Sequence, residues 1–183
     1  MGINLKVNGV EAQIAGFDKI DDIVRVLPDI PEMSDLFHEF AKSSSERIRT
    51  RIAHHDNLRP DTIKLLLNDA SNAVLESVLN TETVYKYITL DNVERVFATN
   101  FNEAISNLID LLGKLENEEE TFNRIIELAV KNKDPQVRYN LAKRTGTNMK
   151  LQRILAKDLD ADVANEAKTN LNGDINPYRS RRR

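Results

Sequence analysis

The sequence repeats its own pattern at a constant interval of 26 residues. The segment Asp-Pro-Gln-Val-Arg-Tyr-Asn-Leu-Ala at 134–142 returns in outline at 160–168, and the apolar positions of 48–53 return at 74–79. Self-similarity at a fixed period indicates a repeat array, in which each unit cannot bury its own apolar face and must stack on its neighbours. The repeat therefore predicts stacked helical units and a protein that presents a surface.

The first residues follow a different pattern. Polar and apolar residues alternate in 3–7 and again in 10–14, with Asn8-Gly9 between them. Asn-Gly between alternating runs is a strong hairpin signal, because both residues tolerate the positive φ of a type I′ turn. We expect a small N-terminal β-hairpin that turns at Asn8-Gly9.

The remainder of the chain is expected to be helical. Asp18 is expected to cap a helix that Pro28 stops, and Ser34 is expected to cap a second one. Further helices are expected at 45–54, 59–67, 71–79, 82–88, 91–99 with Asp91 as its cap, 102–115, 121–130 and in the two clearest repeats. The residues expected to be buried between repeats are Val137, Leu141, Ile154, Leu155 and Val163. The 102–115 helix is expected to bury Ala104, Ile105, Leu108, Ile109, Leu111 and Leu112.

The motif Asp-Pro-x-Val-Arg-x-x-Leu-Ala at 134–142 resembles HEAT-like repeats and the shorter leucine-rich repeat variants (LRV). Degenerate copies at 48–53, 74–79 and 93–100 extend the resemblance over roughly 45–170. It implies an all-α fold, a short right-handed α-solenoid of HEAT/LRV-like helical repeats with the N-terminal β-hairpin attached. Some LRV proteins carry an iron–sulfur cluster on a cysteine-bearing segment, but this chain has no cysteine, so the resemblance brings no cluster. Fold-level resemblance does not carry an activity.

Three regions are expected along the chain: an N-terminal β-hairpin with capping helices at 1–44, the helical array at 45–172, and a basic C-terminal tail at 173–183. The tail carries four arginines beside Tyr178 and has no apolar periodicity. We therefore expect it to be disordered when free.

Composition narrows the classes of function. The chain has 183 residues, of which 40% are hydrophobic and 30% charged, as is typical of one helix-rich domain. The lack of cysteine excludes disulfides, thiol catalysis and cysteine–metal sites. No apolar run reaches the length of a membrane span, and the N-terminus lacks the regions of a signal peptide. We therefore expect a cytoplasmic protein without a membrane contact.

The sequence offers no pattern for catalysis or for a cofactor. His38, His54 and His55 are the only histidines, and adjacent helical positions such as 54 and 55 point to different faces. The chain has no metal-binding His-Glu-x-x-His, no glycine-rich phosphate loop and no Gly-x-Ser-x-Gly. We predict that the protein is not an enzyme and holds no cofactor or metal.

Charge alternates along the array. Residues 134–158 contain six Lys and Arg residues and two aspartates, whereas 102–120 contain one lysine and six acidic residues. A second basic cluster lies in the first repeat, where Arg47 and Arg51 are one helical turn apart. The residues expected to contact a partner are Arg47, Arg51, Arg138, Lys143, Arg144, Arg153, Tyr178, Arg179, Arg181, Arg182 and Arg183.

Two functions fit these patterns. In the first, the chain is a protein-binding scaffold or accessory subunit of a larger, multi-subunit assembly, and its charged patches orient another protein. In the second, the basic repeat faces and the arginine tail bind the phosphates of a nucleic acid. The first is favoured, because a nucleic-acid domain usually has a basic balance overall and this chain has a pI of about 5.7.

Overall fold

The computed structural model describes residues 3–7, 10–15, 17–115, 118–145 and 148–173, and before Asp22 it describes the backbone alone. Within these ranges the chain is α-helical apart from two strands and three short 3-10 helices. The chain forms two compact units, Met1–Ile88 and Thr89–Arg183, and each is described by itself. No described helix combines the length and the apolar character that crossing a membrane requires.

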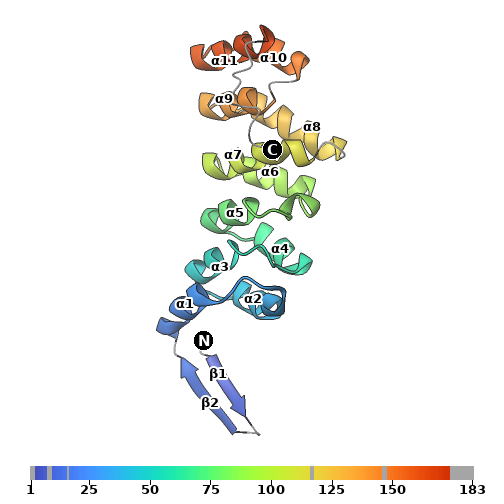
Figure 1. Ribbon diagram of the computed structural model, residues 1–183. Coiled ribbons are helices and arrows are strands. Elements are labelled where there is room, and N and C mark those ends of the chain that lie inside the picture. Colours follow the sequence, from blue (N-terminus) through green and yellow to red (C-terminus); the bar gives the residue numbers. More distant parts are fainter. Residues whose placement is uncertain (1–2, 8–9, 16, 116–117, 146–147, 174–183) are drawn as a thin grey trace. The chain divides into compact units, whose positions relative to one another are not determined.

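The first unit begins with two paired strands. β1 (Ile3–Val7) runs antiparallel to β2 (Val10–Ala15), with Val7 opposite Val10 (Figure 1). The register places the Asn8-Gly9 dipeptide between the strands, but these two residues lie outside the described part of the chain. The type of turn therefore stays a prediction.

The helices of the first unit lie in two rows (Figure 1). They are α1 (Phe17–Val26), α2 (Ser34–Ala41), α3 (Glu46–Ile52), α4 (Pro60–Leu67) and α5 (Asn72–Leu79), with 3-10 helices η1 (Pro31–Met33) and η2 (Val84–Lys86). In one row α3 packs between α1 and α5, and in the other α2 packs against α4. Phe37 of α2 and the apolar stripes of α3, α4 and α5 form the core between the rows.

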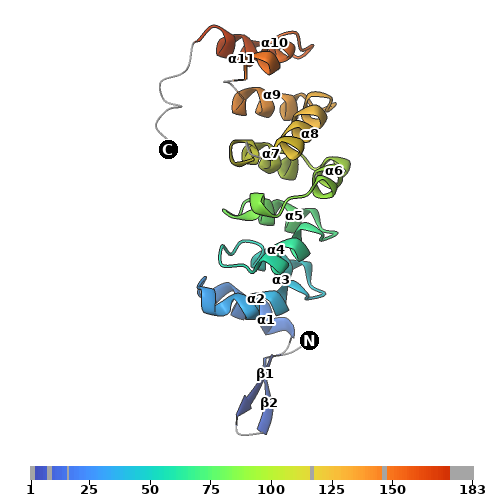
Figure 2. The same ribbon diagram turned by 90° about the vertical axis from the view of Figure 1, so that its right-hand side faces the viewer.

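The second unit has the same alternation (Figure 2). Its elements are α6 (Leu90–Ala98), α7 (Asn102–Asp110), the 3-10 helix η3 (Leu111–Lys114), α8 (Glu119–Val130), α9 (Pro135–Arg144), α10 (Met149–Leu155) and α11 (Ala161–Leu171). In one row α9 packs between α7 and α11, while in the other α6 packs against α8. α10 packs on both α9 and α11.

The 26-residue spacing of the sequence is the spacing of helix N-caps. Ser71 accepts a hydrogen bond from the Val74 amide, and Asp134 accepts one from the Gln136 amide. Asp160, 26 residues after Asp134, accepts from two amides at the start of α11. Each cap satisfies N–H groups that have no partner inside the helix, so the repeated polar residue fixes where each helix begins.

Three predicted caps are wrong. Asp18 lies inside α1, which already begins at Phe17. Thr89, not Asp91, caps α6, and it forms a reciprocal capping box with Asn92; Asp91 lies in the first turn, where its charge favours the helix N-terminus. Ser34 lies inside helical structure, because Pro31 already begins a 3-10 turn before it, and a proline ring suits a first helical position.

Two predicted helices are shorter than expected. The 82–88 segment contains only η2, since its β-branched and aromatic residues have low helix propensity. The 102–115 helix changes at Leu111 into the tighter η3, which contains Gly113, and glycine is unfavourable inside a helix. All six apolar residues predicted to be buried in this segment are buried.

The predicted core of the last repeats is right at four of five positions. Val137, Leu141, Leu155 and Val163 are at most 1% exposed, whereas Ile154 is 57% exposed. The seven-residue helix α10 buries Leu151, Gln152 and Leu155, and Ile154 projects from outside that stripe. The prediction for Ile154 is therefore wrong, and its exposure becomes relevant to function.

Candidate functional site

Arg138, one of the predicted partner-binding residues, is used inside the fold. From α9 its Nε and Nη2 atoms donate to the two carboxylate oxygens of Asp158 at 2.7 and 2.8 Å, and its Nη1 donates to the Asn132 carbonyl at 2.7 Å. The two side chains are only 15% and 10% exposed. The hydrogen bond from Arg138 holds the pKa of Asp158 below its ordinary value. Arg138 therefore fixes the turn after α10 to α9.

The first unit contains the same arrangement. Arg49 donates to both oxygens of Asp69 at 2.6 and 3.0 Å, and also to the Ser43 carbonyl at 2.9 Å. Asp69 accepts the Ser71 amide just as Asp158 accepts the Asp160 amide, both at 2.9 Å. In both cases a bidentate, charge-assisted pair spans 20 residues and positions the next helix cap.

The other predicted cations are placed differently. Arg47 and Arg51 both lie on α3, and each has an interaction partner within the chain. Arg144 forms an ion pair with Asp110 of α7, with both side chains about half exposed. Lys143 is exposed at the end of α9. The tail residues Tyr178, Arg179, Arg181, Arg182 and Arg183 lie outside the described part of the chain.

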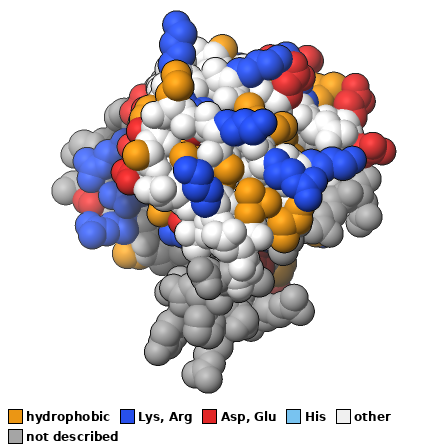
Figure 3. Space-filling view, turned by 90° about the horizontal axis from the view of Figure 1, so that it is seen from above, with side chains coloured by type: hydrophobic (Ala, Val, Ile, Leu, Met, Phe, Trp, Pro, Cys, Tyr) orange, Lys and Arg blue, Asp and Glu red, His pale blue; other side chains and the backbone are white. Residues whose placement is uncertain are grey.

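Arg153, by contrast, belongs to a group of exposed basic and aliphatic side chains on α10, α11 and the turn between them. We call this group the terminal face. Its members are Lys150, Arg153, Ile154, Lys157, Leu159 and Lys168. Viewed from the α10–α11 end, Lys and Arg side chains gather around apolar ones (Figure 3). Ile154 is 57% exposed and Leu159 is fully exposed.

The terminal face is positive because its six members include four cations and no carboxylate. Asp158 is bound to Arg138, and Asp160 accepts the amides that begin α11. Within the described ranges, none of the four cations of the terminal face forms an ion pair. Their charge is therefore available to a molecule from outside.

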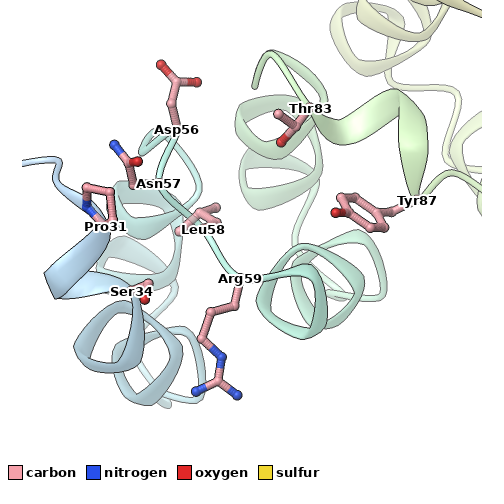
Figure 4. Close-up of a pocket in the computed structure, with 8 residues that line it drawn as sticks. All are labelled: Pro31, Ser34, Asp56, Asn57, Leu58, Arg59, Thr83 and Tyr87. Carbon is pink, nitrogen blue, oxygen red and sulfur yellow. The ribbon is translucent and has the colours of Figure 1, made fainter.

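A shallow groove of about 290 Å³ lies in the first unit (Figure 4). Thr83 and Tyr87 face the loop 57–59 across it. Its one lining arginine is engaged: Arg59 is bound to Asp35 at 2.6 Å and Asp61 at 2.5 Å. The positive charge of Arg59 is therefore neutralised within the first unit.

The loop beside this groove is held by Asp29. Its carboxylate accepts the amides of Asp56 at 2.8 Å and Asn57 at 3.1 Å. Burial alone would raise the pKa of Asp29, but these hydrogen bonds outweigh it and the pKa lies below its ordinary value. The carboxylate is thus a structural acceptor for the loop.

A second groove, of about 420 Å³, follows the outer side of α9 and α11. Tyr139 and Gln136 line it from α9, and Asp162, Asn165 and Thr169 line it from α11. Its lining is polar and acidic, which is the opposite of the terminal face.

The three histidines do not form one site. His55 stacks on Phe37 with ring centroids 4.2 Å apart, and burial lowers its pKa so that the neutral ring is favoured. His54 instead lies 3.3 Å from the Ser77 hydroxyl, and His38 lies 2.8 Å from the Thr62 hydroxyl. Among the described residues, no three His, Asp or Glu side chains are grouped as a metal site would need.

A buried polar network holds the last three helices together, and the sequence patterns did not reveal it. Gln152 of α10 donates to the carbonyls of Ala142 and Thr145 at 3.0 and 2.9 Å. Asn170 of α11 donates to the same Ala142 carbonyl at 3.1 Å. These carbonyls at the end of α9 lack helical partners, so the network satisfies them and supports the terminal face from within.

Compared with family models, with curated proteins and with solved structures, the chain matches none.

Proposed function

We propose that the chain is a non-catalytic, cytoplasmic scaffold or accessory subunit of a larger assembly, and that it binds another protein. Its fold in this proposal is the short right-handed α-solenoid of HEAT/LRV-like repeats, with the N-terminal β-hairpin at one end. The alternating rows within each unit and the N-caps 26 residues apart support the repeat architecture.

The observation that carries this proposal is the exposure of Ile154 and Leu159 among cations that form no ion pair with any described residue. The outermost repeat of an array normally has a polar outer face, because no further repeat covers it. Here the two aliphatic side chains are exposed at the last described helices. Exposed apolar surface with a polar rim is typical of a protein-interaction site.

Nucleic-acid binding is the second candidate, and the four exposed cations of the terminal face favour it. Phosphates need cations, but they gain nothing from aliphatic neighbours, and bases bind to aromatic side chains by stacking. The terminal face contains Ile154 and Leu159 and no aromatic residue. Protein binding therefore accounts for more of its chemistry.

The test is affinity capture from an extract of the native host, with and without nuclease. We expect a specific protein to remain bound after nuclease treatment. Loss of all bound material on nuclease treatment would contradict the proposal and support the nucleic-acid alternative.

A further inference from the structure

We infer that the terminal face docks an acidic amphipathic helix of a partner protein. The inference rests on the proposed function and specifies the partner's chemistry. The apolar edge of the incoming helix would cover Ile154 and Leu159, and its flanking carboxylates would meet Arg153 and Lys157.

The packing within the second unit indicates a helix as the occupant. In one row α9 covers α7 and α11 covers α9, but α11 is the last described member. Within the described residues no later helix covers the exposed side of α10 and α11. An incoming helix would repeat the packing that α11 makes on α9, with apolar side chains at i, i+3 or i+4 and i+7.

The charge of the terminal face indicates that this helix is acidic. Lys150, Arg153 and Lys157 share the exposed side of α10 and the turn after it with Ile154, and Lys168 is exposed on α11. Asp158 and Asp160 are occupied by Arg138 and by backbone amides. Carboxylates on the incoming helix would pair with these cations and set its orientation, whereas lysines would be repelled. The contact should weaken as salt is added.

Three other occupants fit less well. A second copy docked through the same face would bring identical cations together in an isologous contact. The chain's own tail carries Arg179 and three further arginines, so it has the wrong charge. A nucleic acid would leave Ile154 and Leu159 uncovered by apolar groups.

The test is a displayed library of single helices of about 20 residues, roughly 30 Å long, sorted against the full-length chain. Apolar residues are fixed at the core positions, and Glu, Gln or Lys is allowed at each flanking position, so that the sorting itself selects the charge. We expect the enriched helices to carry Glu rather than Lys at the flanks.

Two double variants and a matched control locate the binding site. Arg153→Glu with Lys157→Glu, and separately Ile154→Ser with Leu159→Ser, should each weaken binding about tenfold or more. The control is Arg25→Glu with Val26→Ser in α1, an adjacent arginine and exposed aliphatic residue, which should leave affinity unchanged.

Circular dichroism checks that each variant is folded, and Lys150→Glu with Lys168→Glu replaces the first variant if it unfolds. Enrichment of basic or neutral helices, or binding that is indifferent to the terminal-face variants, would overturn the inference. If the library fails in this way while nuclease-treated extract still yields a protein partner, the proposed function stands and only the acidic helix is wrong. If neither yields a protein ligand, both fail.

Discussion

Replacing Arg138 with methionine should destabilise the second unit by about 3 kcal/mol. Removing one member of a buried ion pair costs about 3–5 kcal/mol, because the other charge stays buried without a partner. The Asp158 carboxylate would lose its hydrogen bonds of 2.7 and 2.8 Å from Arg138. The Asn132 carbonyl would lose the hydrogen bond that it accepts from the same guanidinium. Because 15% and 10% of the two side chains remain exposed, water offsets part of the loss, and we expect the lower end of the range.

The matched control lies on the same helix. Arg144 pairs with Asp110, but these side chains are 53% and 46% exposed, and exposed pairs contribute only about 0.2–1 kcal/mol. Urea unfolding followed by far-UV circular dichroism should therefore separate Arg138→Met from Arg144→Met by about 2 kcal/mol. Equal losses in the two variants would refute the structural role assigned to the Arg138–Asp158 pair.

The same pair makes stability depend on pH at the acid end. The pKa of Asp158 is lower in the folded chain than its ordinary value, and the first cause is the hydrogen bond from Arg138. Its contribution is therefore complete above about pH 4, the ordinary carboxyl value, and is lost as the pH falls through the folded-state pKa. In Arg138→Met this part of the acid sensitivity should disappear.

The remaining predictions concern the core, a histidine and the tail. Leu141→Ala should cost about 2–5 kcal/mol in urea unfolding, whereas Ile154→Ala should cost less than about 0.5 kcal/mol; a loss under half a kcal/mol for Leu141 would show that the core face is misplaced. Burial lowers the folded-state pKa of His55, so stability should decline as the pH falls below about 6.5. His55→Phe should keep the stacking on Phe37 and flatten that decline in thermal melts, and an unchanged slope would contradict the assignment. Deleting 176–183 should leave helicity and melting nearly unchanged but weaken partner binding, most visibly at low salt; equal affinity there would exclude a docking role for the tail.

Local signals in the sequence predicted where helices lie better than where they begin. The predicted caps Asp18, Ser34 and Asp91 are wrong, whereas Asp134 and Asp160, which the sequence marks only as repeated positions, cap helices. A short acceptor before an apolar stripe can satisfy the first amides of a helix without help from distant residues. The wide apolar face of 102–115 was clear, since six residues share one side of the segment. In the 82–88 segment, by contrast, the low helix propensity of its residues outweighed the repeat pattern.

The pairings across helices could not be read from periodicity alone. The sequence shows Asp69 and Asp158 at equivalent places, but their arginine partners lie 20 residues earlier, on helices whose neighbours only the fold defines. The sequence did offer one signal of these pairs. An arginine directly follows the aligned apolar residue in both segments, at Ile48-Arg49 and at Val137-Arg138. Ile154 was misplaced because α10 has only seven residues, too few for a helical period to separate the inner face from the outer one.

The most direct measurement of the central claim is site-specific photocrosslinking in a nuclease-treated extract of the native host. A photoactivatable benzoylphenylalanine replaces Leu159, which is fully exposed on the terminal face, and a matched control replaces Leu65 on α4, which is 39% exposed. We expect a discrete protein adduct from position 159 that is absent from position 65 and disappears when Arg153→Glu and Lys157→Glu are added. No adduct at position 159, or one that survives the charge reversal, would contradict the claim that this face binds a protein through apolar and basic side chains together.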